Sequence, residues 1–244
     1  MAYYNTIDYI TPQSTGNATD FGDMDNPKSQ LAACSNSTRG VYGGGFNTSI
    51  YGASAYNTDY MGYITIASTG NSSGFGSLSS NRNSLKATAS TTYGYFAGGG
   101  TTSGNYANAI DYITIASTGN GTDFGDLTEV SYGGGGGASS TRGIFAQSRT
   151  GGSLGEQNRI EYITFGTSGN ATDFGNLSVE RRDGGVSSST TLCVFTGGRS
   201  NGGTFYNTID KVTIASTGNA TDFGDLINAP NVGAGASNGH GGLS

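Results

Sequence analysis

Short runs of aliphatic and aromatic residues, broken by Thr, Asp and Gly, recur along the whole chain of 244 residues. One of them reads IDYITI at residues 110–115. Its counterparts align on an Ile-Thr or Val-Thr pair that begins at Ile10, Ile64, Ile113, Ile163 and Val212, so that successive copies are 54, 49, 50 and 49 residues apart. Because self-similarity at a nearly constant period indicates a repeat architecture, we interpret the chain as five copies of one structural unit.

Each copy has the pattern of two strands joined by a turn. A phenylalanine follows each Ile or Val at a distance of 11 residues, at Phe21, Phe75, Phe124, Phe174 and Phe223. Gly-Asn stands between the two in every copy, from Gly16-Asn17 to Gly218-Asn219. Both residue types tolerate the positive φ that a tight turn requires. The spacing therefore predicts a β-hairpin with its turn at Gly-Asn.

Two further segments precede each hairpin and complete a unit of four strands. One is an apolar run that usually ends in glycines, such as YGYFAGGG at 93–100, and before it comes a segment of very small residues, such as LKATAS at 85–90. The 15 Tyr and 11 Phe favour strands, and no stretch rich in Ala, Leu, Glu and Lys is long enough for a helix. The sequence predicts an all-β protein.

Four short strands in about 50 residues are the signature of a β-propeller blade of the kelch period. The order of the segments also resembles a kelch repeat: a small-residue strand, a strand ending in Gly-Gly, the IDYITI-type strand, and a strand with one large aromatic residue. The chain departs from kelch in having no Trp, and Phe takes the matching place. The resemblance implies a five-bladed kelch-like β-propeller, with residues 1–244 as a single domain and the small-residue strands nearest the axis.

The two ends of the chain carry complementary parts of one unit. Residues 3–24 supply a third and a fourth strand, whereas residues 232–242 supply a first strand, VGAGAS, and a truncated second. We therefore expect the N- and C-terminal strands to pair in one blade and to close the ring, because closure removes free sheet edges.

Composition and charge argue against several classes of partner. A net charge of −6 with only 11 Lys and Arg leaves little basic surface for nucleic acid. No apolar run approaches the roughly 18 residues of a membrane span, and the first residues lack the basic start and apolar core of a signal peptide. Cys34 and Cys193 fall at different positions of the repeat, so we expect two buried free thiols.

The motifs that suggest chemistry have structural explanations. Asp-Phe-Gly, which binds magnesium in kinases, occurs four times without the other kinase motifs, so we expect its Phe to pack between blades and its Asp to close a turn. The repeated carboxylates match no EF-hand spacing. His240 is the only histidine and cannot pair with another. We expect no catalytic site, no metal site and no cofactor.

The wording of the repeat, IDYITIASTGNGTDFGDL at 110–127, also resembles kelch-like repeat proteins of tailed bacteriophages. This resemblance implies a non-enzymatic virion structural or accessory protein, attached to the capsid or tail, that docks other virion proteins or binds a host-surface glycan. Two alternatives stay open. A secreted or cell-surface carbohydrate-binding (lectin-like) propeller needs an aromatic residue at the same rim position of several blades, and a glycoside hydrolase needs two or three carboxylates in the central funnel.

The working surface is expected on the loops between the glycine-rich strand and the hairpin, because loops on a rigid scaffold carry function. These loops cover residues 46–60, 101–109, 149–159 and 199–208. The first is the longest and contains FNTSIYGASAYNTDY. Clustered exposed aromatic residues are typical interface anchors. We predict that Phe46, Tyr51 and Tyr56 lie on one face and contact a neighbouring virion protein.

Overall fold

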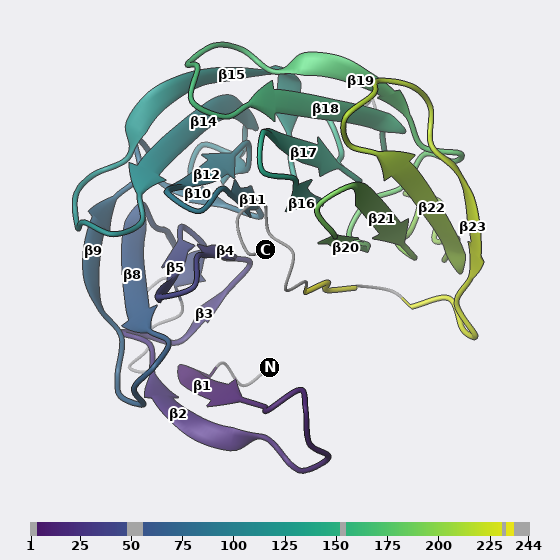
Figure 1. Ribbon diagram of the computed structural model, residues 1–244. Coiled ribbons are helices and arrows are strands. Elements are labelled where there is room, and N and C mark those ends of the chain that lie inside the picture. Colours follow the sequence, from purple (N-terminus) through teal and green to yellow (C-terminus); the bar gives the residue numbers. More distant parts are fainter. Residues whose placement is uncertain (1–3, 48–55, 152–154, 231–232, 237–244) are drawn as a thin grey trace.

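The computed structural model describes residues 4–47, 56–151, 155–230 and 233–236, and every regular element in these ranges is a β-strand. The all-β prediction is confirmed. Four antiparallel sheets of four strands follow one another around a common centre, and the two-stranded N-terminal sheet lies at the start of the row (Figure 1). Each four-stranded sheet spans one repeat.

The strands of each sheet pair in chain order from the centre outwards. The N-terminal sheet comprises β1 (Thr6–Tyr9) and β2 (Thr19–Asp23). The first sheet comprises β4 (Ala32–Ser35), β5 (Arg39–Gly43), β8 (Tyr60–Thr65) and β9 (Ser73–Ser77). The second comprises β11 (Lys86–Ala89), β12 (Tyr93–Ala97), β14 (Ala107–Thr114) and β15 (Thr122–Ser131). The third comprises β16 (Gly135–Ala138), β17 (Arg142–Ala146), β18 (Arg159–Thr164) and β19 (Thr172–Asn176). The fourth comprises β20 (Gly185–Ser188), β21 (Leu192–Thr196), β22 (Thr208–Thr213) and β23 (Thr221–Asp225).

Two small sheets form where the chain passes from one large sheet to the next. One comprises β3 (Lys28–Ser29), β6 (Phe46–Asn47) and β7 (Tyr56–Asn57), and the other comprises β10 (Arg82–Asn83) and β13 (Gly100–Thr101). In both, the segment that enters a sheet pairs with the loop that follows the second strand of that sheet.

The strands nearest the centre are the ones predicted from their small residues. Neighbouring inner strands contact each other directly: Thr88 Oγ1 donates to the Gly137 carbonyl at 2.9 Å, and the Ala138 N–H donates to Ser188 Oγ at 3.0 Å. A Cβ on Gly136 would lie 2.3 Å from the Ala87 carbonyl oxygen. Larger residues there would separate the strands, so the small-residue composition follows from this contact.

The turn of each hairpin does not lie where the sequence placed it. The N–H of Ser68 donates to the Thr65 carbonyl at 3.1 Å, and the Ser117 N–H donates to the Thr114 carbonyl at 3.2 Å. In these copies the chain therefore reverses at Thr-Ile-Ala-Ser, ahead of Gly-Asn, and the other copies turn at the equivalent residues. The prediction of a Gly-Asn turn is wrong, because a contact with the neighbouring sheet holds that pair.

The Gly-Asn pair docks on the outer strand of the preceding sheet. The Gly70 N–H donates to the Phe21 carbonyl at 2.7 Å, and Asn71 Oδ1 accepts the Asp23 N–H at 3.0 Å. The same two bonds join Gly119-Asn120 to β9, Gly169-Asn170 to β15 and Gly218-Asn219 to β19. A Cβ on Gly22 would lie 2.4 Å from the Gly70 carbonyl oxygen, which explains the glycine of Asp-Phe-Gly. We call this contact the Gly-Asn clamp.

The aspartate of Asp-Phe-Gly has a local role beside the clamp. Asp123 Oδ1 accepts the Gly125 N–H at 3.1 Å, and Asp222 Oδ1 accepts the Gly224 N–H at 3.0 Å. The register between the third and fourth strands shifts at the same place in all five hairpins. The aspartate thus satisfies a backbone donor beside a β-bulge, whereas the sequence placed it at a turn.

The hydrophobic core is divided into clusters that lie between successive sheets. Phe75 and Leu78 of the first sheet pack with Phe96, Ile113 and Ile115 of the second. The second and third sheets, and the third and fourth, share clusters of the same kind. The prediction that Phe packs between units is confirmed, since Phe75, Phe124 and Phe174 each lie in one of these clusters. The burial of the facing apolar surfaces holds neighbouring units together.

Buried ion pairs cross the same contacts. Asp111 of the second sheet bonds to Arg82 and accepts hydrogen bonds from the Ser79 N–H and Oγ at 3.2 and 3.0 Å. Asp210 of the fourth sheet lies 3.0 Å from Arg181, and both side chains are fully buried. Buried charges need both an opposite charge and hydrogen bonds. The two acids therefore fix where each sheet meets the one before it.

Removing one acid should destabilise the fold far more than removing an exposed one. Asp111→Ala leaves Arg82 buried without its counter-charge, which costs about 3–5 kcal/mol. Asp123→Ala, on the neighbouring strand, removes one exposed hydrogen bond worth about 1 kcal/mol. Urea unfolding of both variants measures the difference, and equal losses would show that the ion pair does not stabilise the contact.

The third sheet obtains its cation from a different element. Ser131 stands where the other repeats have Arg82 and Arg181, and Lys86 of β11 donates a hydrogen bond to its Oγ. Burial lowers the pKa of Lys86 to about 8, although the nearby charge of Glu161 opposes this shift. The inner strand of one sheet thus supplies a positive group to the next.

The stability of the protein should rise with pH between about pH 8 and pH 10. In this window an unfolded lysine still holds its proton, whereas the folded Lys86 has released it, so unfolding takes up a proton and is opposed by rising pH. Lys86→Met should abolish this rise, which amounts to about 2 kcal/mol. Urea unfolding at both pH values tests it. The same pH dependence in protein and variant would contradict the assignment.

Candidate functional site

The loops predicted to carry function form a regular rim at one end of the sheets. In each sheet, one residue of the loop after the second strand forms backbone pairs on both sides. On one side it pairs with the segment that enters the sheet, and on the other with a residue just before the third strand. The pairs are Ser29↔Phe46↔Asn57, Asn83↔Gly100↔Tyr106, Tyr132↔Arg149↔Glu156 and Arg182↔Arg199↔Phe205. We call these twelve positions the loop rim. Its backbone is shared by all four sheets, and its side chains differ.

The predicted contact residues lie on or beside the loop rim of the first sheet. Phe46 is partly buried on β6, and Tyr56 on β7 is 52% exposed. Asn47 pairs with Tyr56 and its Nδ2 donates to the Tyr56 hydroxyl at 3.3 Å. Directly paired residues share a face of an antiparallel ribbon, so Tyr56 and Phe46 project from opposite faces of it. Tyr51 lies outside the described residues.

Further aromatic residues lie on the rim of the second, third and fourth sheets, and the sequence reasoning did not select them. Tyr106 stacks on Tyr132 with 5.0 Å between ring centroids and 30° between planes. Phe205 is 45% exposed. Tyr106 and Phe205 occupy the same rim position in different repeats, which an alignment of the copies on the acidic residue of the third strand reveals.

The rim of the third and fourth sheets is charged. Arg182 Nε lies 2.9 Å from Glu156 Oε1, and Arg199 Nε donates to Asp183 Oδ2 at 3.1 Å. Arg149, Arg182 and Arg199 are three of the 11 basic residues of the chain, and all three lie on this part of the rim. In the sequence, the recurrence of Arg149 and Arg199 at a spacing of 50 residues could have indicated this charged part of the rim. The loop rim therefore has an aromatic residue on every sheet, whereas the ion pairs around Arg182 lie over the third and fourth sheets.

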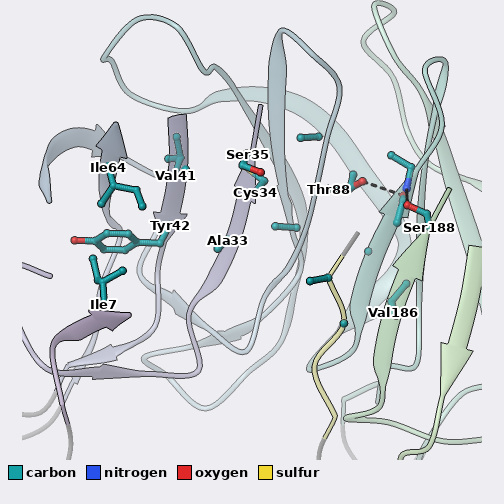
Figure 2. A pocket seen from close by; sticks show the side chains of 18 of the residues that line it. Ile7, Ala33, Cys34, Ser35, Val41, Tyr42, Ile64, Thr88, Val186 and Ser188 are labelled. Atoms are coloured by element: carbon teal, nitrogen blue, oxygen red, sulfur yellow. Dashed lines mark hydrogen bonds between the residues drawn. The ribbon is translucent and has the colours of Figure 1, made fainter. Parts of the chain in front are cut away.

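A cavity of about 440 Å³ opens at the centre, between the inner strands and the N-terminal sheet (Figure 2). Ile7, Tyr42 and Ile64 lie together at one end of it, and Val186 and Ser188 lie at the other. The Tyr42 hydroxyl donates to Asp25 at 2.8 Å and lies 2.8 Å from Ser72 Oγ. Among the described lining residues are hydroxyls and one thiol but no carboxylate, lysine or arginine. This lining suits an apolar occupant and lacks the carboxylate pair of a glycoside hydrolase.

The groups around Asp25 are arranged to keep it ionised. Burial by itself raises the pKa of Asp25, but hydrogen bonds from Lys28, Asn26 and Tyr42 outweigh this, and the pKa lies below its usual value. Lys28 Nζ approaches both carboxylate oxygens at 2.8 and 2.9 Å. This network joins the segment after the N-terminal sheet to the first sheet, so we assign it a structural role.

The two cysteines are free, as expected, but only one is fully enclosed. Cys193 is buried, whereas Cys34 is partly exposed where it lines the cavity. The surrounding protein raises the pKa of the Cys34 thiol to about 12 and raises that of Cys193 as well. Since the thiolate is the nucleophile and metal ligand, neither is poised for chemistry at neutral pH. In the described part of the chain no three His, Cys, Asp or Glu side chains are grouped to hold a metal ion.

The thiols should resist alkylation while the protein is folded. With a pKa near 12, Cys34 should react with iodoacetamide at pH 8 at least about a hundredfold more slowly than an exposed cysteine, because so little thiolate is present. Unfolding in urea should restore the ordinary rate for both residues. Mass spectrometry of the time course measures this, and rapid labelling of folded Cys34 would show that the cavity stabilises its thiolate.

Comparison with known proteins gives information on the fold alone. No protein-family model matches the sequence, and no curated protein matches it. A solved structure of YjhT is similar, with a TM-score of 0.73 at 12% identity over 91% of this chain and 76% of the YjhT chain. At this identity the likeness is one of fold alone. The described residues contain no helix long and apolar enough to cross a membrane.

Proposed function

We propose that the protein is a non-enzymatic structural or accessory component of a bacteriophage virion, which docks another virion protein through its loop rim. The observation that carries the proposal is the uneven chemistry of that rim. Aromatic residues lie on or beside the rim of every sheet, with Tyr56 and Phe205 exposed, whereas the paired charges around Arg182 lie over the third and fourth sheets. Aromatic anchors beside fixed charges favour a single oriented protein contact.

The scaffold in this proposal is a closed five-bladed kelch-like propeller in which β1 and β2 share a blade with the C-terminal residues. Its support is a backbone bond that recurs with the repeat. The Ser84 N–H donates to Gln30, the Gly133 N–H to Ser84, and the Gly233 N–H to Asp183, at 2.7, 2.8 and 2.9 Å. Gly233 thus makes the backbone bond that Ser84 and Gly133 make just before the inner strands β11 and β16. The second strand of this blade would come from residues 237–242, which lie outside the described residues.

A rigid ring of this kind suits docking better than catalysis. Its inner strands contact one another closely, and its central cavity has an apolar lining. The chemical variety lies in the loops, where one backbone pattern presents different side chains in each repeat. Such a division between constant frame and variable rim is what a docking surface requires.

A carbohydrate-binding propeller is the second candidate, and one observation favours it. Tyr106 and Phe205 take the same rim position in two repeats, which is the periodic aromatic arrangement that binding of a repeating glycan requires. Asn57 and Glu156 fill that position in the other two repeats with described rims. The period is therefore broken, and docking of a protein remains the better-supported function.

Replacing the predicted contact residues tests the proposal. A variant with Phe46→Ser, Tyr51→Ser and Tyr56→Ser should fold but fail to enter virions, because the aromatic anchors of the contact are lost. Leu192→Ser, an exposed apolar residue at the start of β21, is the matched control. Mass spectrometry of purified particles measures incorporation of both.

Three results would count against docking at this rim. Normal incorporation of the triple variant would place the contact elsewhere, and absence of the wild-type protein from particles would reject the virion role. Loss of glycan-array binding on Tyr106→Ala and Phe205→Ala, with incorporation intact, would favour the lectin function.

A further inference from the structure

Four Gly-Asn clamps are complete in the structure, and both halves of a fifth are present without being joined. The receiving strand is β23, whose TDFGD sequence is identical to that of β2. The docking pair is Gly16-Asn17, in the connection between β1 and β2. Within the described residues no atom lies within 4 Å of a Cβ built on Gly224 of the receiving strand, whereas a clamp contact brings such a Cβ on Gly22 to 2.4 Å from the Gly70 carbonyl oxygen.

Apolar side chains on both halves are exposed where their counterparts are buried. Phe223 is 56% exposed, whereas Phe21, Phe75, Phe124 and Phe174 are 3–7% exposed. On the facing half, Ile10 is 65% exposed, whereas Ile113, Ile163 and Val212 are 2–5% exposed and Ile64 is partly buried. The same residue types therefore meet at the complete contacts and face solvent at the fifth.

We propose that the β1–β2 connection of the same chain docks on β23, with the Gly16 N–H donating to the Phe223 carbonyl and Asn17 Oδ1 accepting the Asp225 N–H. The partner surface is specified by the four existing clamps, since the donor, the acceptor and the glycine of the receiving strand are all in place. Figure 1 shows the N-terminal sheet and the fourth sheet as the two end members of the row of sheets around the centre, so each is the other's missing neighbour.

This contact differs in composition from the other four. Ile227, which is fully exposed, stands where Ser79, Thr128 and Ser178 donate to a buried acid at three other contacts. The acid of the N-terminal sheet at the equivalent place is Asp8, which is exposed. The fifth contact therefore joins by the clamp and by apolar burial, without a described ion pair. It also requires none of residues 237–244, and it is independent of the virion role.

A cysteine pair across the proposed clamp tests it in the full-length protein. Asn17→Cys with Asp225→Cys, treated at high dilution with a short bismaleimide, should give an internally crosslinked monomer. Asn120→Cys with Ser77→Cys is the matched control, because Asn120 Oδ1 accepts the Ser77 N–H at 3.0 Å in a complete clamp. The wild-type protein, in which Cys193 is buried and Cys34 is partly exposed in the cavity, shows the background. Similar yields of internal crosslink for the two pairs support the proposal.

Two outcomes would overturn it. Crosslinked dimers from the test pair, with internal crosslinks from the control, would mean that β23 receives a second copy of the chain. No crosslink from the test pair would mean that the halves stay apart.

A thermal measurement covers the case in which the cysteine pair does not fold. Phe223→Ser should lower the melting temperature by at least half as much as Phe174→Ser, because a docked Phe223 is buried like its counterpart. An unchanged melting temperature would show that Phe223 remains in solvent and would overturn the proposal.

Discussion

The contact between one sheet and the next is the interaction on which this structure depends. A four-stranded sheet of this size cannot bury both of its faces alone, and stacking against neighbours supplies the missing partner. Here Phe75 fills the space between two sheets while Asn120 binds the backbone two residues beyond it. Apolar burial supplies the attraction, and the two hydrogen bonds of each clamp set the register in which the sheets meet.

Buried charge makes this contact specific. An acid on the third strand receives an arginine and a hydroxyl from the segment that leaves the preceding sheet, as Asp111 does from Arg82 and Ser79. An ion pair in such a place contributes little net stability compared with apolar packing, but breaking it is costly. The pairing therefore penalises wrong arrangements of sheets. Lys86 shows that a different element can supply the cation when the usual position holds a serine.

The same constraint separates structural from variable residues. Positions at the centre and between sheets hold small, apolar or charge-paired side chains, whereas the loop rim keeps its backbone pairing with chemically different side chains. Tyr106 and Glu156 can therefore occupy equivalent rim positions without disturbing the sheets. This freedom allows the rim to combine aromatic residues with the ion pairs of the third and fourth sheets, and it is why we propose that the docking surface lies there.

The repeat period, the strand content and the small inner residues were determined by sequence alone, because periodicity and residue size act locally. The sequence did not determine the role of Gly-Asn, because a tight turn and a docking contact favour the same residue types. Only the position of the preceding sheet shows that Gly-Asn forms a docking contact. The burial of Arg82 and Lys86 was equally hidden, because their partners are 29 and 45 residues away. At the rim, the sequence singled out Phe46 and Tyr56, but the stack of Tyr106 on Tyr132 depends on two strands that meet only in the folded chain.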